Sequence, residues 1–160
     1  MRRLSVPIFF LLFGVFPLAA QSLDWSSVGS TGAIDESSTA LYDFSGRALQ
    51  FRSGATGTIV ARYQVHDTYG AGVTRTPPWH VLWASLSDGA TVRLLSVEKC
   101  FGAEQTICTI TSTEGSGPSC RLCIFGELLN FGTNSYYIET TLTRSSTATN
   151  SALNLVALSP

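Results

Sequence analysis

Apolar and polar residues alternate along several short stretches of the chain, and no window of a dozen residues beyond the first twenty shows a convincing period near 3.6. Alternation with a period of two is typical of β-strands that have one buried face. We predict about eight or nine short strands, among them LYDF at 41–44, ALQFR at 48–52, GTIVARYQVH at 57–66, WHVLWASLSDG at 79–89, ATVRLLSVEKC at 90–100, TICTITST at 106–113, SYYIETTLTR at 135–144 and ALNLVAL at 152–158.

Turn-forming clusters separate these strands, for example RSGATG, STEGSGPS and FGTNS. Their recurrence every 10–15 residues or so is close to the spacing expected of a sandwich or barrel. We therefore predict an all-β fold, an antiparallel two-sheet β-sandwich with the jelly roll as one candidate topology. A small closed barrel is the alternative.

The face of each strand follows from the alternation. In the stretch 57–66 we expect one buried face, formed by Ile59, Ala61, Tyr63 and Val65. The dipeptide Asp88-Gly89 stands between two predicted strands, and Asp-Gly in such a place is a strong hairpin signal. We therefore expect the strands on either side of it to pair with each other.

The first twenty residues have the three parts of a secretory signal: Arg2 and Arg3, an uncharged apolar stretch, and the small residues Ala19 and Ala20. A membrane anchor is the alternative, but the apolar run contains two prolines and has the minimum length for a span. We predict that residues 1–20 are a cleaved signal peptide and that the protein is secreted or periplasmic.

The rest of the chain is expected to hold a Ser/Gly-rich N-terminal lead-in at 21–40 and a single β-sandwich domain at 41–160. Removal of residues 1–20 leaves eight basic against eleven acidic residues, a formal charge of −3. This charge argues against a basic patch that binds nucleic acid or, after signal cleavage, an anionic membrane.

The four cysteines, Cys100, Cys108, Cys120 and Cys123, are an even number in a chain that we expect to be exported, so we predict two disulfides. We favour Cys100–Cys108, across a hairpin with its loop around residues 101–106, together with Cys120–Cys123. Two crossed bridges between that hairpin and the CRLC segment are the alternative. No amphipathic helix follows Cys-x-x-Cys, which argues against a redox centre, and the spacing supplies only one close pair of zinc ligands.

Four acidic residues near the front of the chain are candidates for a structural calcium site, because calcium prefers oxygen ligands from loops. They are Asp24, Asp35, Glu36 and Asp43. Their spacing matches no calcium-loop motif, and solvated acidic loops are the alternative interpretation. No other cofactor is expected, and the two histidines, His66 and His80, lie outside any nucleophile or metal motif.

Aromatic residues are the sharper indication of a binding surface. Tyr69, Trp79 and Trp83 are candidates for ligand contact, since aromatic rings on a sheet face or loop commonly stack against sugars. Packing in the core is the alternative for the two tryptophans, and Tyr69 is the aromatic that we most expect to be exposed.

The sequence thus predicts an exported, non-catalytic β-sandwich that acts as a binding or surface module, with a glycan or another extracellular protein as its partner. A small secreted enzyme that uses carboxylate or histidine chemistry is one alternative. An adhesin or assembly subunit is another.

Overall fold

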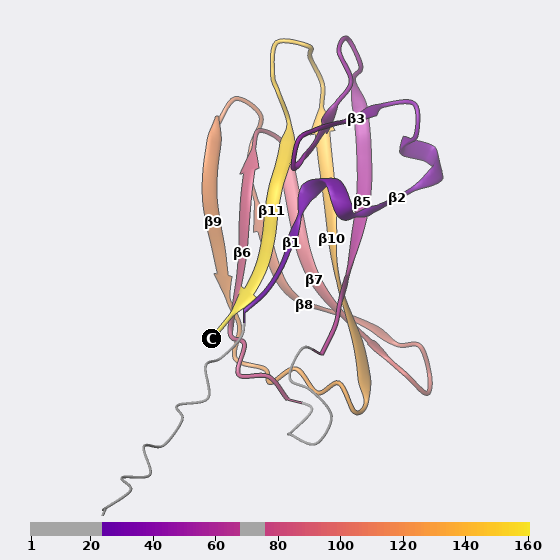
Figure 1. The fold of residues 1–160 in the computed structure, drawn as a ribbon, viewed down its shortest axis with the longest axis vertical. Coiled ribbons are helices and arrows are strands. Elements are labelled where there is room, and N and C mark those ends of the chain that lie inside the picture. Colours follow the sequence, from indigo (N-terminus) through magenta and orange to yellow (C-terminus); the bar gives the residue numbers. More distant parts are fainter. Residues whose placement is uncertain (1–23, 68–75) are drawn as a thin grey trace, which may run out of the picture.

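A computed structural model describes residues 24–67 and 76–160. These residues form two antiparallel β-sheets packed face to face (Figure 1). Sheet A has the strand order β3 (Tyr42–Ser45), β4 (Ala48–Phe51), β11 (Ala152–Ser159), β6 (Val81–Ser87) and β9 (Pro118–Ile124), and β1 (Trp25–Val28) also pairs with β11. Sheet B has the order β2 (Ala33–Ile34), β5 (Gly57–Val65), β10 (Asn134–Arg144), β7 (Ala90–Glu98) and β8 (Glu104–Thr111). Two short 3-10 helices, η1 (Gly29–Thr31) and η2 (Glu36–Ser38), lie between the first strands.

The predicted antiparallel two-sheet sandwich is confirmed, and each of the eight named stretches forms a strand. The described residues form eleven strands, more than the eight or nine expected, because β1, β2 and β9 were not predicted. In β9 the apolar residues Leu122 and Ile124 point away from the core, while Arg121 occupies an inward position opposite Ala84. Sequence alternation therefore could not show which side of this strand faces the core.

The stretch expected as an N-terminal lead-in contributes β1, β2, η1 and η2 from residue 25 onward. Trp25 is buried, and β1 runs antiparallel to β11. The predicted signal segment, residues 1–20, lies outside the described residues. Within the described part of the chain, no helix is long and apolar enough to cross a membrane.

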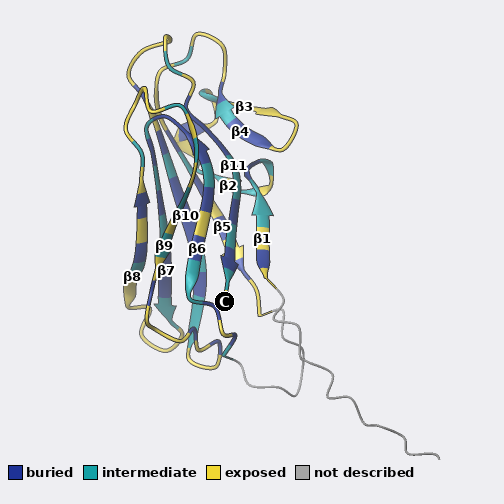
Figure 2. Cartoon of the chain, turned by 90° about the vertical axis from the view of Figure 1, so that its left-hand side faces the viewer, coloured by how far each residue is buried: buried dark blue, intermediate teal, exposed yellow. Residues whose placement is uncertain are grey.

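The core lies between the sheets and is filled from both of them. Along strands such as β6 and β8, buried positions alternate with more exposed ones (Figure 2). The predicted inner face of β5 is confirmed, because Ile59, Ala61, Tyr63 and Val65 are all buried. Tyr63 donates its hydroxyl to the backbone oxygen of Gly29 at 2.7 Å, and burial raises the pKa of this phenol. The hydrogen bond satisfies the one polar group that this side chain takes into the core.

The expected hairpin at Asp88-Gly89 is wrong. β6 belongs to sheet A and β7 to sheet B, so this tight turn carries the chain from one sheet to the other. Both residues have positive φ, 42° and 49°, and Asp88 accepts hydrogen bonds from the backbone N–H groups of Gly117 and Asn150. The Asp-Gly signal predicts a sharp reversal correctly, but the partner of each strand is decided by long-range pairing.

Candidate functional site

A cavity of about 460 Å³ opens at the end of sheet B where β7 ends and β8 begins, at the bottom of the view in Figure 1. Its described lining consists of Ser96, Glu98, Ala103, Glu104, Gln105, Thr133 and Asn134. These residues come from the β7–β8 hairpin and from the start of β10, which are far apart in the sequence. The volume falls in the range of roughly 300–1,000 Å³ that small-ligand sites occupy.

Backbone hydrogen bonds hold the walls of the cavity together. Within the hairpin, the N–H of Glu98 donates to the oxygen of Ala103 at 2.9 Å. Between the two walls, Lys99 donates its N–H to the oxygen of Thr133 at 3.0 Å and its Nζ to the oxygen of Phe131 at 2.7 Å. The cavity is therefore built by tertiary contacts and is not a gap between loose loops.

The lining is polar and rich in hydrogen-bond acceptors. Among the described residues, the carboxylate of Glu98 has no hydrogen-bond partner, whereas Glu104 accepts the hydroxyl of Tyr137 at 2.5 Å. The amides of Gln105 and Asn134 add both donors and acceptors. The described lining includes no Lys, Arg or His, so it suits a neutral, hydroxyl-bearing ligand better than an anion.

An exposed aromatic residue lies in the turn that joins two lining segments of this cavity. Phe101 lies in the turn of the β7–β8 hairpin, between the lining residues Glu98 and Ala103, and is 85% exposed. Sequence reasoning placed Phe101 in the hairpin loop but did not select it as a ligand-contact residue. An apolar ring in a turn was the signal, because such a ring has no neighbouring strand to cover it.

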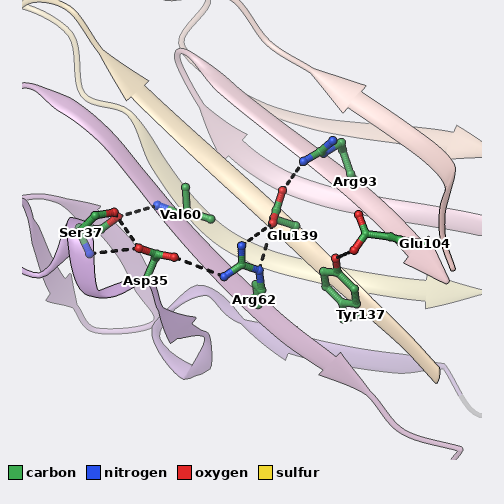
Figure 3. A network of polar contacts seen from close by, with 9 residues as sticks. Asp35, Ser37, Val60, Arg62, Arg93, Glu104, Tyr137 and Glu139 are labelled. Carbon is green, nitrogen blue, oxygen red and sulfur yellow. Dashed lines mark hydrogen bonds and ion pairs between the residues drawn. The ribbon is translucent and has the colours of Figure 1, made fainter. Parts of the chain in front are cut away.

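A ladder of charged side chains crosses the outer face of sheet B next to the cavity (Figure 3). Glu139 of β10 lies directly opposite Arg62 of β5 on one side and Arg93 of β7 on the other. Its carboxylate accepts hydrogen bonds from both guanidinium groups, at 3.0 Å from Nε and Nη2 of Arg62. Asp35 extends the ladder with a 3.5 Å contact to Arg62. Sequence reasoning missed this group, since its members become neighbours only through strand register.

The ladder changes the acid–base properties of its members. Burial acts to lower the pKa of Arg62, but the carboxylates of Glu139 and Asp35 outweigh this effect and raise it. The pKa of Asp35 is lowered, first by the hydroxyl and backbone N–H of Ser37 and then by Arg62. Burial, with the hydrogen bond to Glu104, raises the pKa of Tyr137 to about 12. At neutral pH Tyr137 is therefore protonated and donates its hydroxyl to Glu104.

The predicted aromatic contacts are placed in different environments. Trp79 has no exposed surface and packs edge-on against Phe131, with ring centroids 6.3 Å apart, so it belongs to the core. Trp83 is 36% exposed on the outer face of sheet A and donates its Nε1–H to Ser159 Oγ at 2.9 Å. Tyr69 lies outside the described residues. The two tryptophans therefore do not form one platform.

The favoured disulfide pairing is wrong. The structure joins Cys108 of β8 to Cys123 of β9, with Cα atoms 6.1 Å apart, and leaves Cys100 and Cys120 free and exposed. Cys120 and Cys123 are three residues apart on one strand, so they point to opposite faces. Cys100 lies in the turn after β7, and the residue opposite Cys108 is Leu94. The alternative of two bridges between the hairpin and the CRLC segment is correct for one bridge only, and the prediction of two disulfides is wrong.

The four calcium candidates do not form a site in the structure. Among the described residues, no group of three or more His, Cys, Asp or Glu side chains is arranged to hold a metal ion. Asp24 is exposed before β1, Asp35 caps η2 and binds Arg62, Glu36 opens η2, and Asp43 lies in β3.

Each histidine lies just beyond the end of a strand. His66 is exposed just after β5, and His80 is half-buried just before β6. Neither contributes to the described cavity lining. The histidine version of the enzyme hypothesis therefore has no support from this site.

No protein-family model matches the sequence, and no curated protein matches it. Solved structures of carbohydrate-binding modules are among those similar to the chain. The CBM36-1 domain of a multidomain xylanase from the hindgut metagenome of Trinervitermes trinervoides aligns over 86% of this chain and 98% of that chain, with 14% identity and a TM-score of 0.47. A carbohydrate-binding module of family 29 aligns over 85% and 88%, with 10% identity and a TM-score of 0.43.

A structure with enzymatic function is similar as well. A family two carbohydrate esterase from Cellvibrio japonicus aligns over 85% of this chain and 33% of that chain, with 10% identity and a TM-score of 0.41. At these identities and TM-scores, the matches assign neither a family nor a function to this chain.

Proposed function

We propose that the protein is an exported, non-catalytic module that binds a glycan in the cavity at the end of sheet B. The observation that carries this proposal is a polar cavity, with no Lys, Arg or His in its described lining, next to the turn that carries the exposed Phe101. A sugar ring has hydroxyl groups at its edge and C–H groups on its faces. It therefore needs hydrogen-bonding side chains and an apolar ring at the same place.

Each part of the site has a role in this proposal. The unpaired carboxylate of Glu98 accepts hydrogen bonds from sugar hydroxyls, and the amides of Gln105 and Asn134 bond hydroxyls as donors or acceptors. Phe101 stacks on the C–H face of a sugar at the rim. Tyr137, through its hydrogen bond to Glu104, orients that carboxylate.

Export is part of the same proposal. It rests on the signal-like first twenty residues and on the disulfide, because disulfides persist mainly in oxidising compartments outside the cytoplasm. A polysaccharide outside the cell is then within reach of the cavity.

Retention on insoluble polysaccharides and binding to a glycan array test the proposal. We expect Phe101→Ala to weaken binding about tenfold, the cost of one stacked ring at roughly 1–1.5 kcal/mol, and Glu98→Gln to weaken it as well. Phe44→Ala is the matched control, since Phe44 is also an exposed phenylalanine but lies on β3 at the other end of the sandwich (Figure 1). The proposal fails if the unmodified protein binds no glycan, or if Phe101→Ala and Phe44→Ala have the same effect.

A hydrolase is the second candidate, because two carboxylates, Glu98 and Glu104, line one cavity. Two carboxyl groups flanking a glycosidic bond are the usual machinery of sugar hydrolysis. The release of new reducing ends from a bound oligosaccharide, abolished by Glu98→Gln, would favour this candidate over simple binding. Binding without any release would exclude it.

A further inference from the structure

The outer face of sheet A carries no charged side chain along four of its strands. Of the described residues that point outward from β1, β11, β6 and β9, none is Asp, Glu, Lys or Arg. We call this surface the uncharged face, and it consists of Ser26, Val28, Val81, Trp83, Ser85, Cys120, Leu122, Ile124, Leu155, Ala157 and Ser159. The outer face of sheet B, by contrast, carries the charged ladder. The outer face of sheet B is thus suited to contact with water, whereas the uncharged face of sheet A is suited to contact with another uncharged surface.

Three large apolar side chains are exposed on the uncharged face, on β6 and on the neighbouring edge strand β9. Trp83 lies opposite Leu122 across the β6–β9 pair, and Ile124 follows two residues later on the same side of β9. Leu122 is 47% exposed and Ile124 is 73% exposed. The indole N–H of Trp83 is already bonded to Ser159, so the exposed part of the ring is apolar. Contiguous apolar patches of this kind mark interaction surfaces.

We propose that the uncharged face binds the same face of a second copy of this chain, forming a homodimer with twofold symmetry. An uncharged sheet face needs a partner that brings no charge into the interface, because a buried charge without a counter-charge is costly. A second copy supplies a face that is equally uncharged and has the same twist. Two such sheets stack in the aligned manner of β-sandwich layers, and a twofold axis makes the contact self-complementary.

Association through the face is favoured over strand addition at the edge of β9. The disulfide ties β9 to β8, the edge strand of sheet B. Arg121, which points inward from β9, donates through Nη1 to the backbone oxygen of Thr111 on β8 at 2.9 Å. An inward-pointing charge on an edge strand is a known protection against pairing with another chain. The outer face has no comparable protection.

Sedimentation analysis tests the proposal. The parent protein carries Cys100→Ser and Cys120→Ser, so that the two free thiols cannot link copies covalently. We expect the mass to double as concentration rises, and Leu122→Asp or Ile124→Asp to weaken association at least tenfold. Thr109→Asp is the matched control, because Thr109 is an exposed strand residue on the outer face of sheet B. Circular dichroism checks that each variant folds, which we expect because Leu122 and Ile124 are exposed and lie outside the core.

The sizing result has clear outcomes against the proposal. The proposed homodimer is contradicted if the Cys100→Ser/Cys120→Ser parent stays monomeric up to about 100 µM, a range in which specific dimers assemble. It is also overturned if Leu122→Asp and Ile124→Asp associate as well as Thr109→Asp does. A monomeric parent that adsorbs to a different protein or to lipid vesicles through Leu122 assigns the face to another occupant.

The two free thiols supply a second readout in the unmodified protein. Cys120 lies on the uncharged face, whereas Cys100 lies in the β7–β8 turn, away from it. Dimer formation should slow the alkylation of Cys120 several-fold as protein concentration rises and leave the rate at Cys100 unchanged. Equal rates for Cys120 at low and high concentration contradict the proposal.

Discussion

Loss of the bond between Cys108 and Cys123 should destabilise the protein substantially. The bridge joins edge strands of the two sheets, β8 and β9, and the two cysteines are 15 residues apart in the sequence. In the chain-entropy account, a closed loop of that length restricts the unfolded chain by about 3 kcal/mol at 25 °C. We therefore expect Cys108→Ser/Cys123→Ser to lower the free energy of unfolding by about 3 kcal/mol, a large part of the ~5–15 kcal/mol of an ordinary domain.

Urea unfolding followed by tryptophan fluorescence measures this loss. The parent should carry Cys100→Ser and Cys120→Ser, so that no other thiol can exchange with the bridge. A reducing agent should shift the midpoint of this parent to that of the variant lacking the bridge, while the variant itself should not respond. The expected loss corresponds to a midpoint shift of roughly 1–3 M urea.

Two results would refute this reasoning. One is a loss below about 1 kcal/mol, which would mean that the unfolded chain is hardly restricted by the bridge. The other comes from the unmodified protein, in which alkylation before digestion should label Cys100 and Cys120 and leave Cys108 and Cys123 unlabelled. Labelling of Cys108 or Cys123 would contradict the pairing itself.

Three further substitutions test the core, the phenol and the ladder. Trp79→Ala should lower the free energy of unfolding by about 3–5 kcal/mol, as measured by thermal unfolding, because the side chain has no exposed surface. A loss below about 1 kcal/mol would contradict the place of Trp79 in the core. The pKa of Tyr137, raised to about 12, means that its protonated form stabilises the fold and that this contribution disappears as the pH rises from about 10 to about 12. Tyr137→Phe should reduce the alkaline loss of unfolding free energy in that window, as measured by urea unfolding, and an unchanged alkaline limb would refute the assignment. Glu139→Gln should lower the free energy of unfolding by roughly 1–2 kcal/mol, because the nearly buried carboxylate pairs with two partly exposed arginines. Urea unfolding measures this loss as well. An unchanged free energy of unfolding would show that the ladder contributes nothing to stability.

The fold class was predictable because alternation is a local property of a strand. Ile59, Ala61, Tyr63 and Val65 had to share one side of their strand, and the structure buries all four. In β9 the apolar residues Leu122 and Ile124 also share one side, but that side faces outward. Alternation therefore identifies which residues share a side, but the assumption that the apolar side is the buried one fails for β9.

The candidate site was much less predictable. Alternation placed Trp83 on one side of its strand, but only packing shows that this side is the outer face of sheet A. Trp79 precedes the strand and turns into the core. Glu98 and Asn134, by contrast, meet at the cavity because β7 and β10 pair in that register. A distance of 36 positions along the chain carries no local signal of such a meeting.

The sequence by itself determined that the protein is all-β, which residues of most strands share a side, and where the chain turns sharply. Those properties depend on side chains within a few positions of one another. Tertiary structure decided that Asp88-Gly89 crosses between sheets, that Cys108 bonds Cys123, and that the outer face of sheet B carries ion pairs while four strands of sheet A carry no outward charge. These outcomes depend on which strands become neighbours, and that choice is made by burial of the whole apolar surface at once rather than by any short stretch of residues.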